Sequence, residues 1–198
     1  MSKTQYYCAA SLDGYIADSG DGLDWLTGYE GSFEGENAEP GPMSEGGAYE
    51  EFYAGVGAAI SGSTTYEFVL GHLSAGSSWP YAGKPYWVLS SRDLPMPDDD
   101  AADVRVVDAE IRDLYDELAE AAGQGNIWIV GGGDVASQFA DAGLLDEVLL
   151  TVVPVVLGTG KPLFNRRLEG GAMQLVGTRA FDTGMVELRY EISRFTLS

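Results

Sequence analysis

The sequence has one cysteine and one histidine, Cys8 and His72. A single cysteine excludes a disulfide within the chain, and a reducing cytoplasm is the simplest location for such a protein. The H-x-E…P-C-x-x-C pattern of zinc-dependent deaminases is absent, and Cys8 has no Cys-x-x-Cys partner. We therefore expect neither a metal site nor a nucleophilic triad that uses His72.

Basic residues are also scarce. The chain has three lysines and a formal net charge of −20. Nucleic-acid binding needs a basic face, so this charge argues against a nucleic-acid partner, and it also disfavours anionic membranes. Two interpretations of the acidic surface stay open. It is either a well-solvated surface that favours solubility, or an adaptation to a host whose high internal salt screens the repulsion.

Long apolar runs are missing as well. No run approaches the roughly 20 residues that span a bilayer. The first ten residues, MSKTQYYCAA, are too polar and too short for a signal peptide, so we expect neither a membrane span nor a leader.

The apolar content that is present suits a folded core. Hydrophobic residues make up 45% of the 198 residues, which favours a single domain over residues 1–198. Apolar, β-prone runs alternate with helix-like segments, and this alternation predicts an α/β fold. The expected strands are Thr4–Leu12, Gly57–Ser61, Pro85–Ser91, Val104–Val107, Ile127–Val130 and Asp146–Gly158.

Helices are expected between these strands. Ala48–Val56 reads as a short helix, and the hydroxyl residues from Ser63 can cap a second one. A third helix is predicted after Asp108 as its cap. The apolar residues on one face of this helix are Ile111, Leu114, Leu118 and Ala121, and Gly123 is placed to end it.

Two further segments shape the predicted fold. Thr27–Gly47 has no hydrophobic period and is rich in Gly, Glu, Ser and Pro, so it reads as a flexible insert or as a functional lid. Residues 173–192 read as an antiparallel hairpin with a turn near Asp182–Gly184. Pro154 cannot donate to a sheet ladder, so it predicts a bulge or an edge in its strand. Together these features predict a mixed, mostly parallel sheet flanked by helices, with a C-terminal antiparallel hairpin.

Three strand ends have the chemistry of phosphate binding. They are AISGSTTYE, WVLSSR and IVGGGDVAS, which supply hydroxyl groups, an arginine and three consecutive glycines. Ligands of α/β sheets bind beyond the carboxyl ends of the strands, where backbone N–H groups and helix dipoles favour anions. A dinucleotide could contact all three. GGGDVA is not the G-x-G-x-x-G fingerprint, and GTGKP is not a P-loop.

The order of these junctions resembles the dihydrofolate reductase superfamily. The resemblance is to the branch that includes the C-terminal reductase domain of bacterial riboflavin biosynthesis, and it runs from about Gln5 to Phe164. AASLDGYIA is similar to the opening strand and turn, GSTTYE to G-R-x-T-[WY]-E, and VLSS to I-L-S-S. IWIVGGGDVASQF and AGLLDEVLLTVVPVVLGTGKPLF are similar to the later signatures.

This resemblance implies a three-layer dihydrofolate reductase-like fold that binds NADPH, with NADH as the alternative. By position, it assigns three residues to the nicotinamide and four to a phosphate-binding helix start. It assigns Ser90 and Ser91, with their cofactor-binding neighbours Leu89 and Arg92, to the adenosine end and its 2′-phosphate, and six residues to the pyrophosphate and the nicotinamide side. These residues are Ala9, Ala10 and Ile16; Gly62, Ser63, Thr64 and Thr65; Leu89, Ser90, Ser91 and Arg92; and Gly131, Gly132, Gly133, Asp134, Val135 and Ala136.

Two positions depart from the family pattern. Ser63 replaces the arginine of G-R-x-T, and Arg92 is a substitute phosphate partner. The helix that carries the family's catalytic carboxylate has Ala48 at that place, which leaves Glu51 as the candidate acid and Glu50 and Asp24 as alternatives. Thr151 is expected near the substrate.

The resemblance implies an oxidoreductase that transfers a hydride to a small heterocycle, either pterin-like or like the pyrimidine precursor of riboflavin. Trp25 and Phe52 are expected to shape the substrate side, although Trp25 also suits the core. The branch further implies a homodimer. Two other interpretations stay open: a non-catalytic nucleotide-binding protein that kept the fold, and a scaffold that forms dimers and binds no dinucleotide.

Overall fold

The computed structural model describes residues 2–27, 48–73, 77–168 and 173–193. Almost all of the predicted insert at residues 27–47 lies outside the described residues. In chain order the elements are β1 (Thr4–Ser11), β2 (Tyr15–Ala17), α1 (Asp24–Thr27), α2 (Ala48–Ala54), β3 (Val56–Gly62), α3 (Ser63–His72), β4 (Tyr86–Leu89), β5 (Val104–Val107), α4 (Ile111–Ala122), β6 (Asn126–Val130), α5 (Gly133–Asp141), β7 (Glu147–Val153), β8 (Lys161–Pro162), β9 (Met173–Ala180) and β10 (Val186–Ile192).

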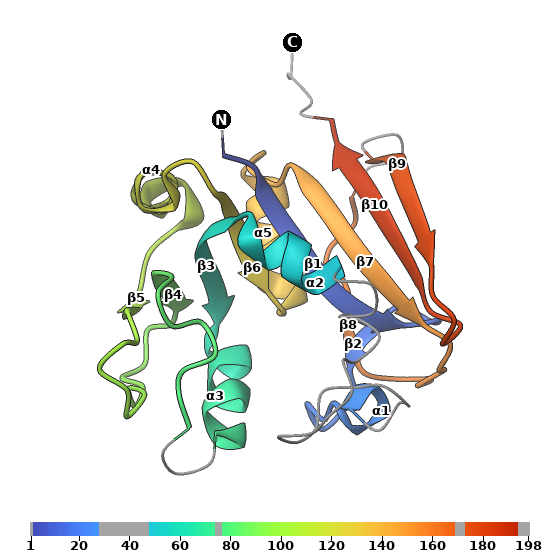
Figure 1. The fold of residues 1–198 in the computed structure, drawn as a ribbon, viewed down its shortest axis with the longest axis horizontal. Coiled ribbons are helices and arrows are strands. Elements are labelled where there is room, and N and C mark those ends of the chain that lie inside the picture. The colour runs from blue at the N-terminus through green and yellow to red at the C-terminus, as the bar shows by residue number, and fades with distance from the viewer. Residues whose placement is uncertain (1, 28–47, 74–76, 169–172, 194–198) are drawn as a thin grey trace.

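One eight-stranded sheet organises the molecule, in the order β5-β4-β3-β6-β1-β7-β10-β9. The strands from β5 to β7 are parallel. The hairpin β9–β10 adds two antiparallel strands beside β7, and Gly184 in its turn has φ +87°. The predicted mixed, mostly parallel sheet and the terminal hairpin are thus confirmed. A separate pair, β2 and β8, lies at the carboxyl edge of β1 (Figure 1).

Helices cover both faces of the sheet. Successive strand residues point to opposite faces, so β1 sends Tyr7 and Ala9 to one apolar cluster and Tyr6 and Cys8 to the other. The first cluster lies under α2 and α3, and the second lies under α4 and α5. Figure 1 shows α2 in front of the sheet and α5 behind it. The result is a three-layer arrangement.

The start and the buried stripe of α4 differ from the prediction. The helix begins at Ile111 with Glu110 at the cap position, and no side chain caps it, so the predicted Asp108 cap is wrong. Ala122, not Ala121, completes the buried stripe. The predicted stop is confirmed, because Gly123 ends α4 with φ +59°, a left-handed value that glycine adopts without strain.

Two other sequence predictions need correction. Strand β7 ends at Val153 and lies between β1 and β10, so Pro154 follows the strand and marks neither a bulge nor an edge. At α3, Gly62 occupies the cap position and makes no side-chain cap bond. The hydroxyl residues therefore lie inside the first turn of α3, where they leave the terminal N–H groups uncapped by side chains.

Candidate functional site

A cavity of about 520 Å³ opens at the carboxyl edge of the sheet. Its floor is the end of β1 and β6, and its walls are the first two turns of α3, the start of α5, and the β2–β8 pair. Eight residues that the sequence assigned to a cofactor line this cavity: Ala9, Ile16, Thr64, Thr65, Gly131, Gly132, Gly133 and Asp134.

The glycine run after β6 forms the turn at the centre of this cavity. Gly131 and Gly132 have φ values of +54° and +67°, in the left-handed region that favours glycine. A Cβ atom on Gly133 would lie 2.4 Å from the Pro162 carbonyl oxygen of β8. At Gly133, the group that approaches the glycine backbone closely is therefore the β8 backbone of the protein itself. A Cβ atom on Gly132 would meet only side-chain atoms, at 3.7 Å or more, and Gly132 lines the cavity.

Two helix N-termini meet at the cavity. Helix α3 follows Gly62 and helix α5 follows Gly132, and no side chain in the described ranges caps either helix. The first N–H groups of a helix lack intrahelical partners, and the helix dipole adds positive potential there. Two such ends on one cavity suit a ligand with more than one phosphate.

Charged groups at the cavity are already paired. The Asp134 carboxylate accepts hydrogen bonds from Gln138 Nε2 at 2.7 Å and from Asn165 Nδ2 at 2.5 Å. Lys161 Nζ lies 3.3 Å from an Asp21 carboxylate oxygen on the opposite rim. Asp134 therefore has protein donors that offset its negative charge near a bound anion.

The segment expected at the adenosine end lies beside α3. Arg92 makes two hydrogen bonds to the Glu67 carboxylate of α3, at 3.2 and 2.7 Å. The Ser90 hydroxyl accepts the Arg92 N–H at 3.0 Å and so closes the turn after β4. These interactions hold Arg92 next to the helix whose first turn lines the cavity.

The other predicted residues are not among the described lining residues of the cavity: Ala10, Gly62, Ser63, Leu89, Ser90, Ser91, Arg92, Val135 and Ala136 for the cofactor, and Trp25, Phe52, Glu51 and Thr151 for substrate and catalysis. Sequence reasoning missed Phe68 and Val69, which line the cavity one helical turn after Thr64 and Thr65. Residues four apart share one face of a helix, so the positions of Thr64 and Thr65 could have predicted Phe68 and Val69 as lining residues. No sequence pattern indicated Lys161 and Pro162 as lining residues, because only the pairing of β8 with β2 brings them to the cavity.

Aromatic rings form the wall between the cavity floor and α2. The Phe52 ring centroid lies 4.3 Å from that of Tyr7 and 5.4 Å from that of Trp128. Tyr81 also contacts Trp128, with ring centroids 5.5 Å apart, and it lines the cavity. Trp25 is half-buried against the same cluster, and its buried Nε1 has no hydrogen-bond partner among the residues that the structure describes. Phe52 is thus placed beside the floor residue Tyr7.

Polar groups gather where β1, β7 and β10 reach this end of the sheet. The side chains of Tyr7 and Thr151 are buried, and within the described part of the chain neither hydroxyl makes a hydrogen bond of ordinary length and angle. Burial raises the pKa of Tyr7 well above its ordinary value, and the nearby Glu187 raises it further. Burial also raises the pKa of Glu187, against the opposing effect of Arg179. Glu51 is exposed on α2 and adds to the rise at Glu187.

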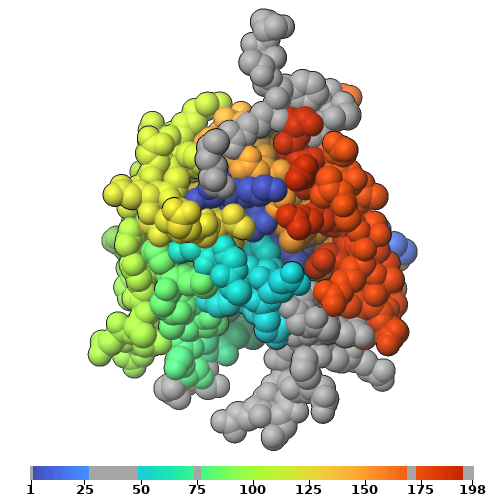
Figure 2. All heavy atoms as spheres, turned by 45° about the horizontal axis from the view of Figure 1, so that its top comes forward, coloured from blue at the N-terminus to red at the C-terminus, as the bar shows by residue number. Residues whose placement is uncertain are grey.

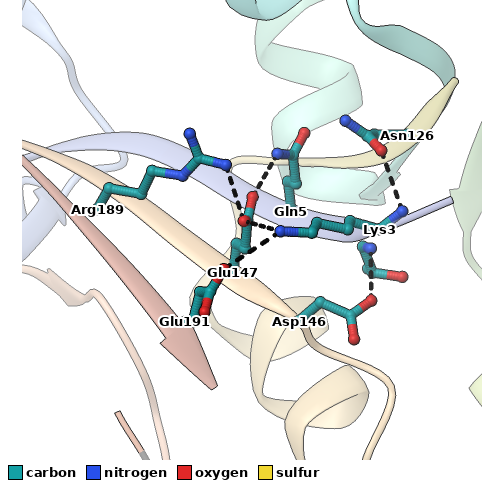
Figure 3. A network of polar contacts seen from close by, with 8 residues as sticks. Lys3, Gln5, Asn126, Asp146, Glu147, Arg189 and Glu191 are labelled. Carbon is teal, nitrogen blue, oxygen red and sulfur yellow. Dashed lines mark hydrogen bonds and ion pairs between the residues drawn. The ribbon is translucent and has the colours of Figure 1, made fainter. Parts of the chain in front are cut away.

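The opposite end of the same three strands carries a saturated network (Figure 3). The fully buried Glu147 carboxylate accepts bonds from Lys3 Nζ at 2.5 Å, Gln5 Nε2 at 2.6 Å and Arg189 Nη2 at 2.8 Å. Burial opposes ionisation of Glu147, but these three donors outweigh it, and the pKa of Glu147 falls below its ordinary value. This network has the character of a structural element.

The cavity offers little for metal or thiolate chemistry. Among the described residues, no three His, Cys, Asp or Glu side chains are grouped to hold a metal ion. Burial raises the pKa of the Cys8 thiol to about 12, so Cys8 is a neutral thiol at physiological pH. Within the described segments, no helix has the length and apolar character needed to cross a membrane.

Solved structures share this fold. A protein of Shewanella sp. PV-4 named for riboflavin biosynthesis aligns over 97% of this chain and 99% of its own, with 27% identity and a TM-score of 0.75. A pyrimidine reductase-like protein of Corynebacterium diphtheriae aligns over 98% and 93%, with 15% identity and a TM-score of 0.63. A Thermotoga maritima diaminohydroxyphosphoribosylaminopyrimidine deaminase/5-amino-6-(5-phosphoribosylamino)uracil reductase aligns over 57% of its chain and 97% of this one, with 16% identity and a TM-score of 0.60.

Sequence comparison gives the family. The Bacillus subtilis (strain 168) protein YwjB is 34% identical over 188 residues, which cover 95% of this chain and 97% of YwjB. YyaP of the same strain is 42% identical over 65 residues, 33% of this chain and 35% of its own. Residues 79–187, more than half of the chain, match the model described as the RibD C-terminal domain. With its dihydrofolate reductase-like α/β fold, this chain belongs to the RibD C-terminal domain family.

Proposed function

We propose that this protein is a reductase that binds NADPH, or NADH, and transfers a hydride to a small heterocyclic substrate. The substrate would be pterin-like or similar to the pyrimidine precursor of riboflavin. The observation that carries the proposal is the convergence of two helix N-termini without side-chain caps and a left-handed glycine turn on one cavity. This geometry suits a pyrophosphate, and it occurs in a member of a reductase family.

The proposed roles follow the cavity. Residues 62–65 and 131–136 would bind the phosphates through backbone N–H groups and the Thr64 and Thr65 hydroxyls. Ala9, Ala10 and Ile16 would contact the nicotinamide, which supplies the hydride when bound. The small Ala9 side chain on the cavity floor and the absence of side chains on the glycine turn leave room for a flat ring.

The substrate side would lie toward α2 and the end of β7. Phe52, in contact with Tyr7, gives this side an aromatic wall, and Trp25 would contribute to it. Glu51 and Thr151 are the catalytic residues that the sequence predicts, and both lie in the polar group around Glu187. We also propose that the protein acts in the cytoplasm as a homodimer.

Arg92 supports the choice of NADPH. A guanidinium binds phosphate strongly, and Arg92 pairs with Glu67 of α3, the helix that begins at Ser63. Ser63 replaces the family's arginine. Glu67 occupies this guanidinium, so a 2′-phosphate must compete with a carboxylate for it. We therefore expect NADPH to bind more tightly than NADH by a modest factor.

The experiment is a titration with NADPH and NADH, followed by the fluorescence of the four tryptophans. The key variant is Thr64→Glu, which puts a negative charge on an exposed side chain at the start of α3. Repulsion of phosphate should weaken binding by about tenfold or more, equivalent to about 1.4 kcal/mol. Gln124→Glu adds the same charge at an exposed position after α4, and we expect it to leave the affinity unchanged.

The cofactor titrations distinguish the proposed reductase from the alternatives. Micromolar binding that Thr64→Glu weakens and Gln124→Glu preserves supports the proposal. Failure of both cofactors to bind below millimolar concentration overturns it. Cofactor binding without reduction of any pterin or pyrimidine would instead support the non-catalytic nucleotide-binding protein.

A further inference from the structure

The first turn-side residues of β10 include Glu187, whose carboxylate lies toward the substrate side of the proposed site. In the sheet register, Ala9 of β1 is opposite Thr151 of β7, and Thr151 is opposite Glu187 of β10. These three residues therefore point to the same face, the one under α2. Two strand spacings separate the Ala9 and Glu187 backbones, about 10 Å. A heterocycle seated over Ala9 and Thr151 would reach the Glu187 side chain.

Two buried hydroxyls lie beside Glu187, and among the described residues neither makes a hydrogen bond of ordinary length and angle. Tyr7 is 2% exposed and Thr151 is 1% exposed. The Tyr7 hydroxyl interacts with Thr151 and Glu187 without a well-formed hydrogen bond, which leaves hydrogen-bonding capacity that a ligand could use. Tyr7 lines the cavity floor, and Thr151 adjoins the floor residue Ala9. A ligand with ring nitrogens and oxygens would satisfy both hydroxyls.

The surroundings of Glu187 favour its protonated form. Burial dominates, and the exposed Glu51 carboxylate of α2 acts in the same direction. The pKa of Glu187 is lowered by three groups: Arg179 of β9, Arg189 of β10 and the Tyr7 hydroxyl. Burial outweighs them, so the pKa of Glu187 is above its ordinary value. Figure 2 shows the cyan segment that includes α2 next to the C-terminal strands in orange and red, so the elements that carry Glu51 and Glu187 are neighbours.

We propose that Glu187 is the proton donor of the reaction, with Tyr7 and Thr151 as the hydroxyls that hold the edge of the heterocycle. This inference rests on the proposed function. The carbon of a C=N bond in the substrate receives the hydride from the dihydronicotinamide, which is thereby oxidised. The nitrogen receives the proton from the Glu187 carboxyl group. The C=N bond becomes a C–N single bond with one new C–H and one new N–H, and Glu187 is left as a carboxylate.

The half-buried position of Glu187 fits this cycle. Its side chain keeps some exposure to solvent, so water can return the proton after each turnover. The family's own acid position, on the helix that carries Glu51, has Ala48 here. The carboxylate would thus come from the neighbouring antiparallel strand instead of the helix. Glu51 would contribute as the like charge that favours the protonated form of Glu187.

The test compares Glu187→Gln with Glu191→Gln, a matched carboxylate on the same strand whose exposed side chain pairs with Lys3. The first measurement is a pH titration of ¹³C-labelled glutamate carboxyl groups, with no cofactor present. We expect one resonance to titrate above the others, to shift when pterin or 5-aminouracil is added, and to disappear only in Glu187→Gln. A Glu187 resonance that neither probe perturbs overturns the proposal.

The second measurement is the rate of dihydropterin reduction with NADPH across the pH range. General acid catalysis contributes at least about 100-fold, so Glu187→Gln should lose that factor, and its rate should no longer fall as Glu187 ionises. Glu187→Asp should restore part of the rate, and Glu191→Gln should match the wild type.

Failure of the acid role and failure of the proposed function give different results. If NADPH binds the wild type and Glu187→Gln equally and the two reduce dihydropterin at the same rate, only the role of Glu187 is overturned. If NADPH does not bind the wild type, the proposed function falls, and the role of Glu187 falls with it.

Discussion

The two ends of strands β1, β7 and β10 each carry a buried or half-buried glutamate, and the pKa shifts of the two glutamates are opposite. At one end, Glu147 is fully buried and has three donors, and its pKa is lowered. At the other end, on the same face, Glu187 is half-buried and its pKa is raised. Thr151 lies four positions after the saturated Glu147 on β7, and its hydroxyl makes no well-formed hydrogen bond to any described residue.

This difference separates stability from function within one sheet. A buried polar group with all its partners contributes to a unique fold, whereas one without partners destabilises it. Proteins keep such unfavourable groups where a ligand or a reaction needs them. We therefore expect substitutions at the Glu147 end to change stability, and substitutions at the Glu187 end to change binding and rate.

The largest effect should come from exchanging each carboxylate for its amide. Glu147→Gln removes the charge that holds Lys3 and Arg189, and it should lower the free energy of unfolding by about 3 kcal/mol, the low end for a broken buried pair because both cations are half-exposed. Glu187→Gln should raise the same quantity by less than about 1 kcal/mol at pH 7, because it removes a charge that burial disfavours. Urea unfolding of both variants measures this. If both variants lost the same free energy of unfolding, the proposed difference between the Glu147 end and the Glu187 end would be wrong.

The pH dependence of unfolding sharpens the same contrast. The pKa of Glu147 is lowered in the fold, so its stabilisation is present above the unfolded pKa of about 4.3 and is lost as the pH falls through the folded pKa. The pKa of Glu187 is raised, so its protonated form is tolerated at low pH, and the fold loses stability as the pH rises through the folded value. Both amide variants should approach the wild type in strong acid. A constant difference at every pH would show that ionisation is not the cause.

A smaller effect is expected from removing one unpartnered hydroxyl. Thr151→Val keeps the shape of the side chain and should raise the free energy of unfolding by about 1 kcal/mol, because no buried hydroxyl is left unsatisfied. Thr4→Val is the matched control, since Thr4 is buried in β1 with its hydroxyl also unpartnered. Both variants should gain stability, but only Thr151→Val should weaken pterin binding. Loss of binding in both would remove Thr151 from the site.

The smallest effect concerns the exposed ion pair between Arg92 and Glu67. Exposed pairs contribute little to stability, so Arg92→Ala should leave the unfolding midpoint unchanged. It should shift the NADPH-to-NADH affinity ratio toward NADH by less than about tenfold. Glu67→Gln should shift the ratio the other way, because it frees the guanidinium for a 2′-phosphate. Ratios that stay constant in both variants would place Arg92 outside the site.

Local patterns in the sequence were sufficient for much of the fold. The apolar period of α4 and its glycine stop predicted that helix, and the run Ile127–Val130 predicted β6, because each depends on neighbours in the chain. The glycine run predicted the centre of the cavity, since three glycines at a strand end permit left-handed turns and close contacts. Pro154 misled the prediction because the length of β7 depends on its partners β1 and β10.

The candidate site was harder to predict where it depends on strand pairing. Glu187 is one of 31 acidic residues, and nothing beside it in the sequence separates it from surface carboxylates. Only the register of β7 with β10 puts it opposite Thr151. Lys161 reaches the cavity in the same indirect way, through the pairing of β8 with β2.

The contact between Gly133 and Pro162 links two walls of the cavity. Leu163, the next residue, donates its N–H to the Gly14 carbonyl oxygen at 3.0 Å, and β8 pairs with β2, which carries Ile16. The start of α5 and Ile16, the proposed nicotinamide contact, are thus connected through the short β2–β8 pair. A side chain at position 133 would have to push Pro162 and Leu163 away, so a substitution there should also shift the β2–β8 wall of the cavity.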